Sequence, residues 1–339
     1  MQRTPGERAA AGQLANLDQL ASSTASTVCG GAAHGCRAVD LRVARGIDLR
    51  ILPDRGFDLG AAWYRGTPLA WVSAVGERGP LDAPRDRDWV DAFGGGLLVT
   101  CGLRNVGAPS EGHGQHGRYS HLRASDVVTE RDFDDDGELV LTARAAVDEV
   151  SALGPHLRLE RVVRTWSGSG RVEVSDRTIN LGDAPEPAPL LYHVNLGPPL
   201  LDDDAEVRIA SGRVLPRDAD AAAGLARWSA PGKPERGAAE LVFEHEVPAD
   251  EHDWCRAALV NRSLGLEVEL SWERGGLPRF HQWLHPASGI YVLGLEPANC
   301  SVLGRAADRA EGRLPLLAPG ATRVTRLRLR CRRATGLPA

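Results

Sequence analysis

Apolar and polar residues alternate with a period of two over much of the chain beyond residue 35. In residues 39–43 and 47–51 every second residue is Val, Leu or Ile, and Ala44-Arg45-Gly46 separates the two runs. Successive side chains of a β-strand point to opposite faces, so each run has the pattern of a strand with one buried face. The two runs and the short turn between them predict a β-hairpin.

Further strand candidates follow along the chain, separated by turn sequences such as Asp134-Asp135-Asp136-Gly137. They are residues 139–147, 157–166, 172–179, 240–243, 264–272, 290–295 and 325–331. Beyond residue 35 the sequence contains no convincing amphipathic helix of about 12 residues and no fixed-period repeat. Many short strands joined by Gly- and Pro-bearing turns predict an all-β fold, either a sandwich or a barrel.

Residues 1–35 have a different character from the rest of the chain. They are rich in Ala, Ser, Gly and Gln, and they predict an extension that is partly helical or irregular, with a short helix around residues 13–20. The 38 glycines and 22 prolines are spread along the chain and do not gather in one linker. We therefore expect residues 36–333 to form a single domain.

The charge balance excludes some classes of partner. The formal net charge of −5, from 40 Lys and Arg against 45 Asp and Glu, is small for 339 residues. It gives no electrostatic reason to expect nucleic acid or an anionic membrane as a partner. Arginines cluster only in residues 323–333, where they alternate with Leu327, Leu329 and Cys331. That period predicts a strand with one solvated face, and a polyanion-binding patch is the alternative.

The cysteines and the absence of long apolar segments bear on location. The six cysteines are scattered without a CxxC pair, which is typical of a reduced protein. No apolar stretch approaches the roughly 20 residues of a membrane helix, and the N-terminus lacks the pattern of a signal peptide. We therefore expect a cytoplasmic protein without a membrane partner.

Two groups of histidines have spacings that metal ligands can have: His113, His116 and His121, then His281 and His285. The first group lies in a Gly-rich loop, and a proline directly follows the second, so neither spacing is fixed by a helix face. Histidines that donate hydrogen bonds or contact a sugar are the simpler interpretation. The chain also lacks the Walker, Rossmann and GxSxG patterns. We expect no metal and no cofactor.

Two strand-like apolar runs are interrupted by a titratable residue. His193 lies in residues 189–199 and Glu296 in residues 290–299, each close to a Pro- or Gly-bearing turn. This position predicts a side chain at the rim of a sheet, facing a cleft. The pattern alone favours the simpler interpretation, a hydrogen-bonded histidine at a strand end and a solvated glutamate.

At these residues the chain resembles the aldose 1-epimerase, or galactose mutarotase-like, superfamily. His193-Val194-Asn195-Leu196 is similar to the catalytic histidine segment of that family, without its aromatic pair, and Leu295-Glu296-Pro297-Ala298-Asn299 is similar to the catalytic glutamate segment. His116-Gly117-Arg118 and Cys101-Gly102-Leu103-Arg104-Asn105 are similar to its sugar-binding segments. The resemblance implies a large antiparallel β-sandwich with an open carbohydrate cleft.

The resemblance also implies an activity, the interconversion of the anomers of a free sugar without a cofactor. In that activity Glu296 is the expected general base and His193 the expected general acid. A shared cleft would keep Glu296 ionised and His193 protonated, since opposite charges favour each other. The expected substrate-binding residues are His116, Arg104 and Asn299. Trp283 either offers a face to the sugar or belongs to the core.

Other activities remain open at this point. The same residue pair could serve an isomerase or a lyase acting on a sugar or keto-sugar, because the segments of His193 and Glu296 depart from the family pattern. A carbohydrate-binding protein without turnover is a third reading. In each case the expected partner is a small-molecule carbohydrate, either neutral or mildly acidic. The sequence leaves the oligomeric state open, with a homodimer as one option.

Overall fold

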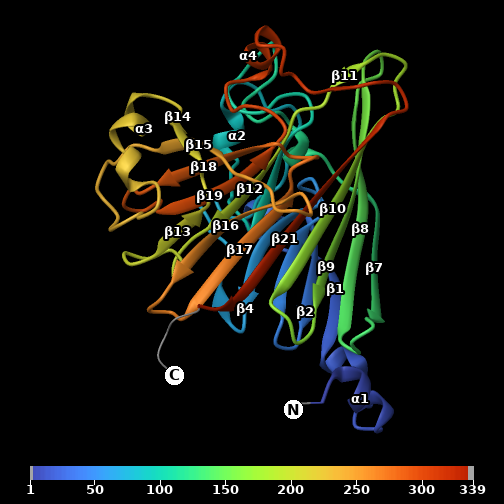
Figure 1. The fold of residues 1–339 in the computed structure, drawn as a ribbon. Coiled ribbons are helices and arrows are strands. Elements are labelled where there is room, and N and C mark those ends of the chain that lie inside the picture. The colour runs from blue at the N-terminus through green and yellow to red at the C-terminus, as the bar shows by residue number, and fades with distance from the viewer. Residues whose placement is uncertain (1–2, 335–339) are drawn as a thin grey trace.

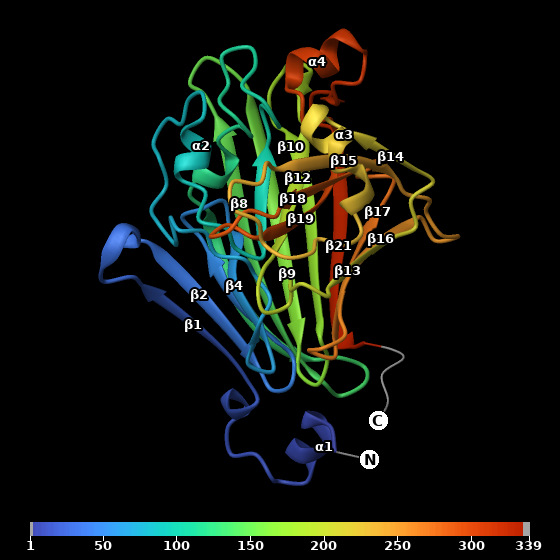
Figure 2. The same cartoon turned by 90° about the vertical axis from the view of Figure 1, so that its left-hand side faces the viewer.

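Two large antiparallel β-sheets, with 11 and 8 strands, pack against each other and enclose the main hydrophobic core (Figure 1). The structure is a computed structural model, and it describes residues 3–334. The prediction of an all-β antiparallel sandwich is confirmed. Figure 2 shows the two layers from the side, with the N-terminal helix α1 beyond one end of the sandwich.

The first sheet contains the hairpin predicted at residues 39–51. Its order is β1 (Ala21–Thr27), β2 (Arg37–Val43), β3 (Ile47–Leu52), β4 (Asp58–Tyr64), β6 (Leu98–Gly102), β12 (Leu190–Leu196), β19 (Val292–Ala298), β18 (Arg279–His285), β15 (Leu241–Glu246) and β14 (Arg213–Pro216). The short strand β5 (Thr67–Pro68) pairs with β4.

The second sheet contains the longest strands of the protein. Its order is β13 (Glu206–Ile209), β16 (Trp254–Asn261), β17 (Leu266–Glu273), β21 (Thr322–Arg333), β10 (Arg171–Asn180), β9 (His156–Trp166), β8 (Leu139–Val150) and β7 (Ser125–Phe133). A separate two-stranded sheet joins β11 (Glu186–Pro187) and β20 (Leu316–Leu317).

The helices are all short, and none of those described is long and apolar enough to span a membrane. The α-helices are α1 (Pro5–Ala10), α2 (Asp88–Asp91), α3 (Ala219–Ala223) and α4 (Arg305–Ala310), and the 3₁₀ helices are η1 (Leu17–Gln19), η2 (Gly31–Ala33), η3 (Tyr119–His121) and η4 (Leu225–Arg227).

Alternating burial along the strands explains why the pattern of period two predicts them well. In β3 the side chains of Ile47, Leu49 and Ile51 are at most 1% exposed and belong to the core. In β21 the leucines face the core, while Arg326 and Arg328 on the other face pair with glutamates of the neighbouring strands. The prediction of a solvated arginine face is confirmed, because the side chains of Arg326 and Arg328 are 52% and 49% exposed.

The N-terminal region differs from the prediction. The helix lies at Pro5–Ala10, and residues 13–20 contain only the 3₁₀ turn η1, so the helix expected there is wrong. A capping box starts the helix at Pro5. The side chain of Thr4 accepts from the backbone N–H of Glu7, and the carboxylate of Glu7 accepts from the N–H of Thr4. Residues 21–27 form β1, which pairs with β2 and extends the first sheet into the region expected to be an extension.

The centre of the first sheet carries the segments that the sequence singles out. β12 pairs with β6 on one side and with β19 on the other. All seven residues of β12 and all seven of β19 are buried. Both faces of these strands are covered, so their sequences are nearly continuous apolar runs. The few polar residues in these runs are therefore buried as well.

Candidate active site

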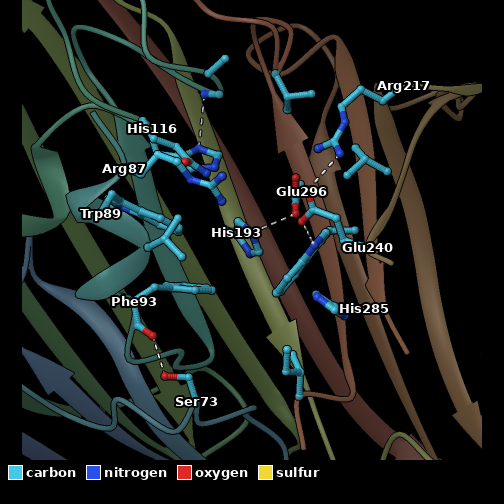
Figure 3. A pocket seen from close by; sticks show the side chains of 18 of the residues that line it. Ser73, Arg87, Trp89, Phe93, His116, His193, Arg217, Glu240, His285 and Glu296 are labelled. Carbon is cyan, nitrogen blue, oxygen red and sulfur yellow. Dashed lines mark hydrogen bonds and ion pairs between the residues drawn. The ribbon is translucent and has the colours of Figure 1, made fainter. Parts of the chain in front are cut away.

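His193 on β12 and Glu296 on β19 lie side by side. The Nε2 atom of His193 is 3.1 Å from Oε1 of Glu296, and both side chains are almost fully buried. The strand register explains this contact, since Val194 is opposite Leu295, which places His193 directly opposite Glu296 on the same face of the sheet. Figure 3 shows the pair at the centre of a pocket. The structure thus brings together the two residues that the sequence predicts to be catalytic.

The pair faces a cavity of about 840 Å³ on the outer side of the first sheet. Of the four substrate-binding residues expected, His116 and Trp283 line this cavity. Aromatic rings surround the histidine: the centroid of the His193 ring lies 5.2 Å from that of Trp283 and 5.3 Å from that of Phe93. Aromatic side chains therefore line the cavity next to His193 and Glu296, the two groups that can exchange protons.

Burial sets the protonation of the pair. Burial, reinforced by the nearby carboxylate of Glu240, raises the pKa of Glu296 to about 8. Burial also lowers the pKa of His193 to about 4. At neutral pH the pair therefore holds one proton, on Glu296, and neither group is charged. This is the reverse of the expected ionised Glu296 and protonated His193, because removal from water disfavours both charges.

Gly294 makes room for the pair. A Cβ atom at this position would lie 2.7 Å from Oε1 of Glu296 and 3.2 Å from Cε1 of His193. Asn195, opposite Gly294 in the ladder, donates from its amide to the backbone oxygens of Gly96 and His193. The missing side chain of Gly294 and the hydrogen bonds of Asn195 to the backbone thus allow His193 and Glu296 to stay in contact.

His116 reaches the cavity from the loop after β6. Its Nδ1 accepts a hydrogen bond of 3.3 Å from the backbone N–H of Gly107, so Nε2 is the atom that carries the proton in the neutral ring. Burial lowers the pKa of His116 to about 3, and the ring therefore stays neutral. Its ring packs at an angle of 46° against the ring of Trp89, with 4.5 Å between the centroids. His116 is thus suited to donate one hydrogen bond to an uncharged ligand atom.

Sequence reasoning missed Glu240 and Arg217. Glu240 accepts from Nε1 of Trp283 at 2.9 Å and from Nη2 of Arg217 at 2.9 Å. Although burial acts in the opposite direction, the hydrogen bond from Arg217 lowers the pKa of Glu240, so this carboxylate is ionised. Glu240 begins the strand candidate 240–243 and Arg217 follows β14, but nothing in the sequence marks either of them as a cavity residue. Together they fix the orientation of the Trp283 ring.

The loops over the first sheet supply the other cavity residues that the sequence did not indicate. Trp89 and Phe93 stack with 4.4 Å between their ring centroids in and just after α2. Figure 3 shows the side chain of Arg87 beside His116, directed into the cavity. The one feature of the sequence that could have indicated them is local composition, since two aromatic residues and an arginine occur within the seven residues 87–93.

Arg104 and Asn299 do not line the cavity, so the structure does not bring these two expected binding residues to the pair. The side chain of Asn299 accepts from the backbone N–H of Leu190 at 2.8 Å and donates to the oxygen of Ala188 at 3.2 Å. It therefore joins the end of β19 to the start of β12. Arg104 begins a loop that leaves the sheet, and its backbone oxygen accepts from Arg305.

The histidines considered as metal ligands are separated in the structure. His281 on β18 contacts the backbone oxygen of Cys300 at 3.1 Å, while His285 lines the cavity. His121 accepts from the backbone N–H of Leu81 at 3.1 Å. Within residues 3–334 no three His, Cys, Asp or Glu side chains gather in a way that could hold a metal ion.

The comparisons with known proteins bear on the fold of the chain. A protein from Klebsiella pneumoniae subsp. pneumoniae named as a "putative aldose 1-epimerase" has a TM-score of 0.86 and 24% identity, over 93% of this chain and 86% of that chain. A galactose mutarotase-like protein from Clostridium acetobutylicum has a TM-score of 0.62 and 13% identity, over 93% and 100%. For galactose 1-epimerase from Lactobacillus acidophilus the values are 0.55 and 10%, over 93% and 99%.

These likenesses confirm the predicted resemblance at the level of the fold. No curated protein matches the sequence. The family model described as a domain of unknown function, DUF4432, matches residues 33–331, which is nearly the whole sandwich. The chain therefore has the galactose mutarotase-like fold and belongs to the DUF4432 family.

Proposed function

We propose that this protein is an isomerase of the aldose 1-epimerase type, which interconverts the anomers of a free sugar. The observation that carries the proposal is the contact of 3.1 Å between Nε2 of His193 and Oε1 of Glu296 at the wall of a cavity. Exchange of anomers requires one proton to leave the anomeric hydroxyl and one to reach the ring oxygen. Both oxygens are bonded to C1, so two adjacent proton-carrying atoms can serve them together.

The protonation of the resting pair gives the direction of the first step. His193 takes the proton of the anomeric hydroxyl while the bond from C1 to the ring oxygen breaks, and Glu296 gives its proton to that oxygen. The open-chain aldehyde then rotates about its C1–C2 bond. On closure the ring hydroxyl returns its proton to Glu296, its oxygen attacks C1 from the other side, and the imidazolium of His193 protonates the carbonyl oxygen. The pair ends as it began, and no electrons are transferred.

Other cavity residues support the binding of a sugar. The neutral His116 can donate from Nε2 to a hydroxyl or ring oxygen. The Trp283 ring, held by Glu240, can pack against the C–H groups of one sugar face. In this proposal the cytoplasm is the place of action and a small carbohydrate is the partner.

Magnetisation exchange between α and β anomers, measured by NMR across a panel of reducing sugars, tests the proposal. We expect the purified protein to accelerate exchange for one sugar or a small group of sugars above the spontaneous rate. Conversion to a new product without anomer exchange would instead support isomerisation or lyase chemistry by the same pair. Binding without either reaction would indicate a carbohydrate-binding protein.

The rate of exchange should depend on pH with two limbs. Below about pH 4 His193 takes up a proton and the pair loses its base, and above about pH 8 Glu296 loses its proton and the pair loses its acid. We therefore expect kcat/KM to be highest between these values and to fall on both sides. Exchange measured between about pH 3 and pH 10, with the spontaneous rate subtracted, checks this. A rate that keeps rising above pH 9 would contradict the assignment of Glu296 as donor.

A further inference from the structure

The cavity has two parts of different chemistry. In Figure 3 His116 and Arg217 lie above the reactive pair and Glu240 lies beside Glu296, while Phe93 and Ser73 lie below His193. Hydrogen bonds and a ring contact connect Phe93 and Ser73 with Trp71, Val75 and Ile290. We call the space that these five residues border the apolar compartment: Trp71, Ser73, Val75, Phe93 and Ile290.

The polar atoms of the apolar compartment are already engaged within the protein. The indole N–H of Trp71 donates to the backbone oxygen of Ile290 at 2.6 Å. The hydroxyl of Ser73 donates to the backbone oxygen of Phe93 at 2.6 Å and accepts from the N–H of Val75 at 3.1 Å. Neither side chain therefore has a proton left to donate to a ligand. A sugar hydroxyl that contacts this surface would lose part of its hydration without gaining a hydrogen-bond donor from either side chain, which is unfavourable.

The apolar surface of the compartment is open to solvent. Val75 is 36% exposed and Ile290 38% exposed, and both border the cavity. The ring centroids of Phe93 and Trp71 are 5.7 Å apart, and those of Phe93 and His193 are 5.3 Å apart. The compartment is therefore continuous with the reactive pair. Exposed apolar side chains gathered beside a polar site are typical of a ligand-binding surface.

The size of the cavity agrees with a ligand that extends beyond the hemiacetal. Its volume of about 840 Å³ lies in the upper part of the range of roughly 300–1,000 Å³ that is usual for sites of drug-sized ligands. A sugar ring held at His193 and Glu296 leaves the apolar compartment available for a substituent.

We propose that the substrate is an aldose that carries an apolar group in place of a hydroxyl or hydroxymethyl group, and that this apolar group occupies the apolar compartment while the hemiacetal lies at His193 and Glu296. The group is a methyl, alkyl or aryl substituent on a carbon other than C1, since exchange needs a free anomeric hydroxyl. This inference rests on the function proposed above and specifies its substrate class.

Matched pairs of sugars that differ only at C6 test the inference. Suitable pairs are D-galactose with D-fucose, D-glucose with 6-deoxy-D-glucose, and L-mannose with L-rhamnose. In the pair whose ring stereochemistry fits the site, we expect kcat/KM for exchange to be at least about tenfold higher for the deoxy sugar, since one group in an apolar pocket is worth roughly 10–200-fold. Isothermal titration of the same sugars should show the same order of affinity.

Two substitutions to threonine separate the compartment from the rest of the surface. Val75→Thr keeps the side-chain volume and adds a hydroxyl to the apolar compartment, so the preference for the deoxy sugar should fall severalfold. Val72→Thr is the control, because Val72 is 57% exposed and does not line the cavity. It should leave the preference unchanged.

Each outcome decides one of the two proposals. Equal or weaker binding of the deoxy sugar in every pair, or no binding of any pair, overturns the inference, and so does a preference that Val75→Thr leaves intact. Tighter binding of a deoxy sugar without anomer exchange supports the inference about the ligand and contradicts the proposed reaction. Anomer exchange at equal rates for both sugars of every pair supports the proposed reaction and contradicts the inference about the apolar group.

Discussion

Replacing Glu296 by Gln is expected to slow catalysed anomer exchange by about 10²–10⁴-fold, the usual contribution of one general acid–base group. Glutamine has nearly the same shape as a protonated glutamate, but it can neither give a proton to the ring oxygen nor take one back. His193→Ala should have an effect of similar size, because the anomeric hydroxyl then loses its base. Exchange measured by NMR with the best sugar of the panel gives both rates.

A matched substitution separates chemistry from folding in this experiment. Glu246 lies on β15 of the same sheet with an exposed side chain, so Glu246→Gln should leave the rate unchanged. Sugar binding and the midpoint of thermal unfolding should stay close to the wild-type values in Glu296→Gln. Rates near wild type in both Glu296→Gln and His193→Ala would reject the site assignment.

Several strands of the sandwich were predictable because they bury one face only, whereas β7, β16 and β18 were not among the candidates. The pattern of period two in residues 139–147 and 157–166 marks β8 and β9 almost to their ends. The N-terminal region was less predictable, since β1 is a strand of small polar residues whose side chains are largely exposed. Pairing with β2 stabilises it, and a pairing partner leaves no periodic signal in the strand itself.

The two reacting residues were predictable for a related reason. β12 and β19 are buried on both faces, so a titratable residue in either run is conspicuous. The remainder of the site was not predictable, because Trp89 lies in the short helix α2 outside the sheet and Arg217 follows a short edge strand. Asn299 has the right position in the sequence, yet its amide completes the backbone bonds of Leu190 and Ala188.

A second conspicuous polar cluster lies between the sheets, beneath the strand that carries His193. Arg161 of β9 has no exposed side-chain surface, and its guanidinium pairs with Asp176 at 2.6 Å and with Asp58 at 3.0 Å. It also donates to the hydroxyl of Thr100 at 2.8 Å. The hydroxyl of Tyr192, next to His193, donates to Asp176 at 2.6 Å. One arginine thus connects β9 and β10 of one sheet with β4 and β6 of the other.

Arg161→Met is expected to lower the free energy of unfolding by about 3–5 kcal/mol, because it leaves two buried carboxylates without their cation. This is a large fraction of the roughly 5–15 kcal/mol that stabilises an ordinary domain. Arg158→Met on the same strand is the matched control, since its pair with Asp148 is partly exposed and such pairs contribute at most about 1 kcal/mol. Equilibrium unfolding in urea measures both variants.

The loss should also depend on pH, and the direction identifies its cause. Burial already raises the pKa of Asp58 to about 6 against the opposing effect of Arg161, so without the arginine the pKa should rise further. A carboxyl group with a raised pKa in the folded state binds more protons there than in the unfolded chain. Stability therefore falls as the pH rises through that pKa. We expect Arg161→Met to lose less stability at about pH 5 than at about pH 8. A loss that does not change with pH would show that packing, and not the buried carboxylates, causes the destabilisation.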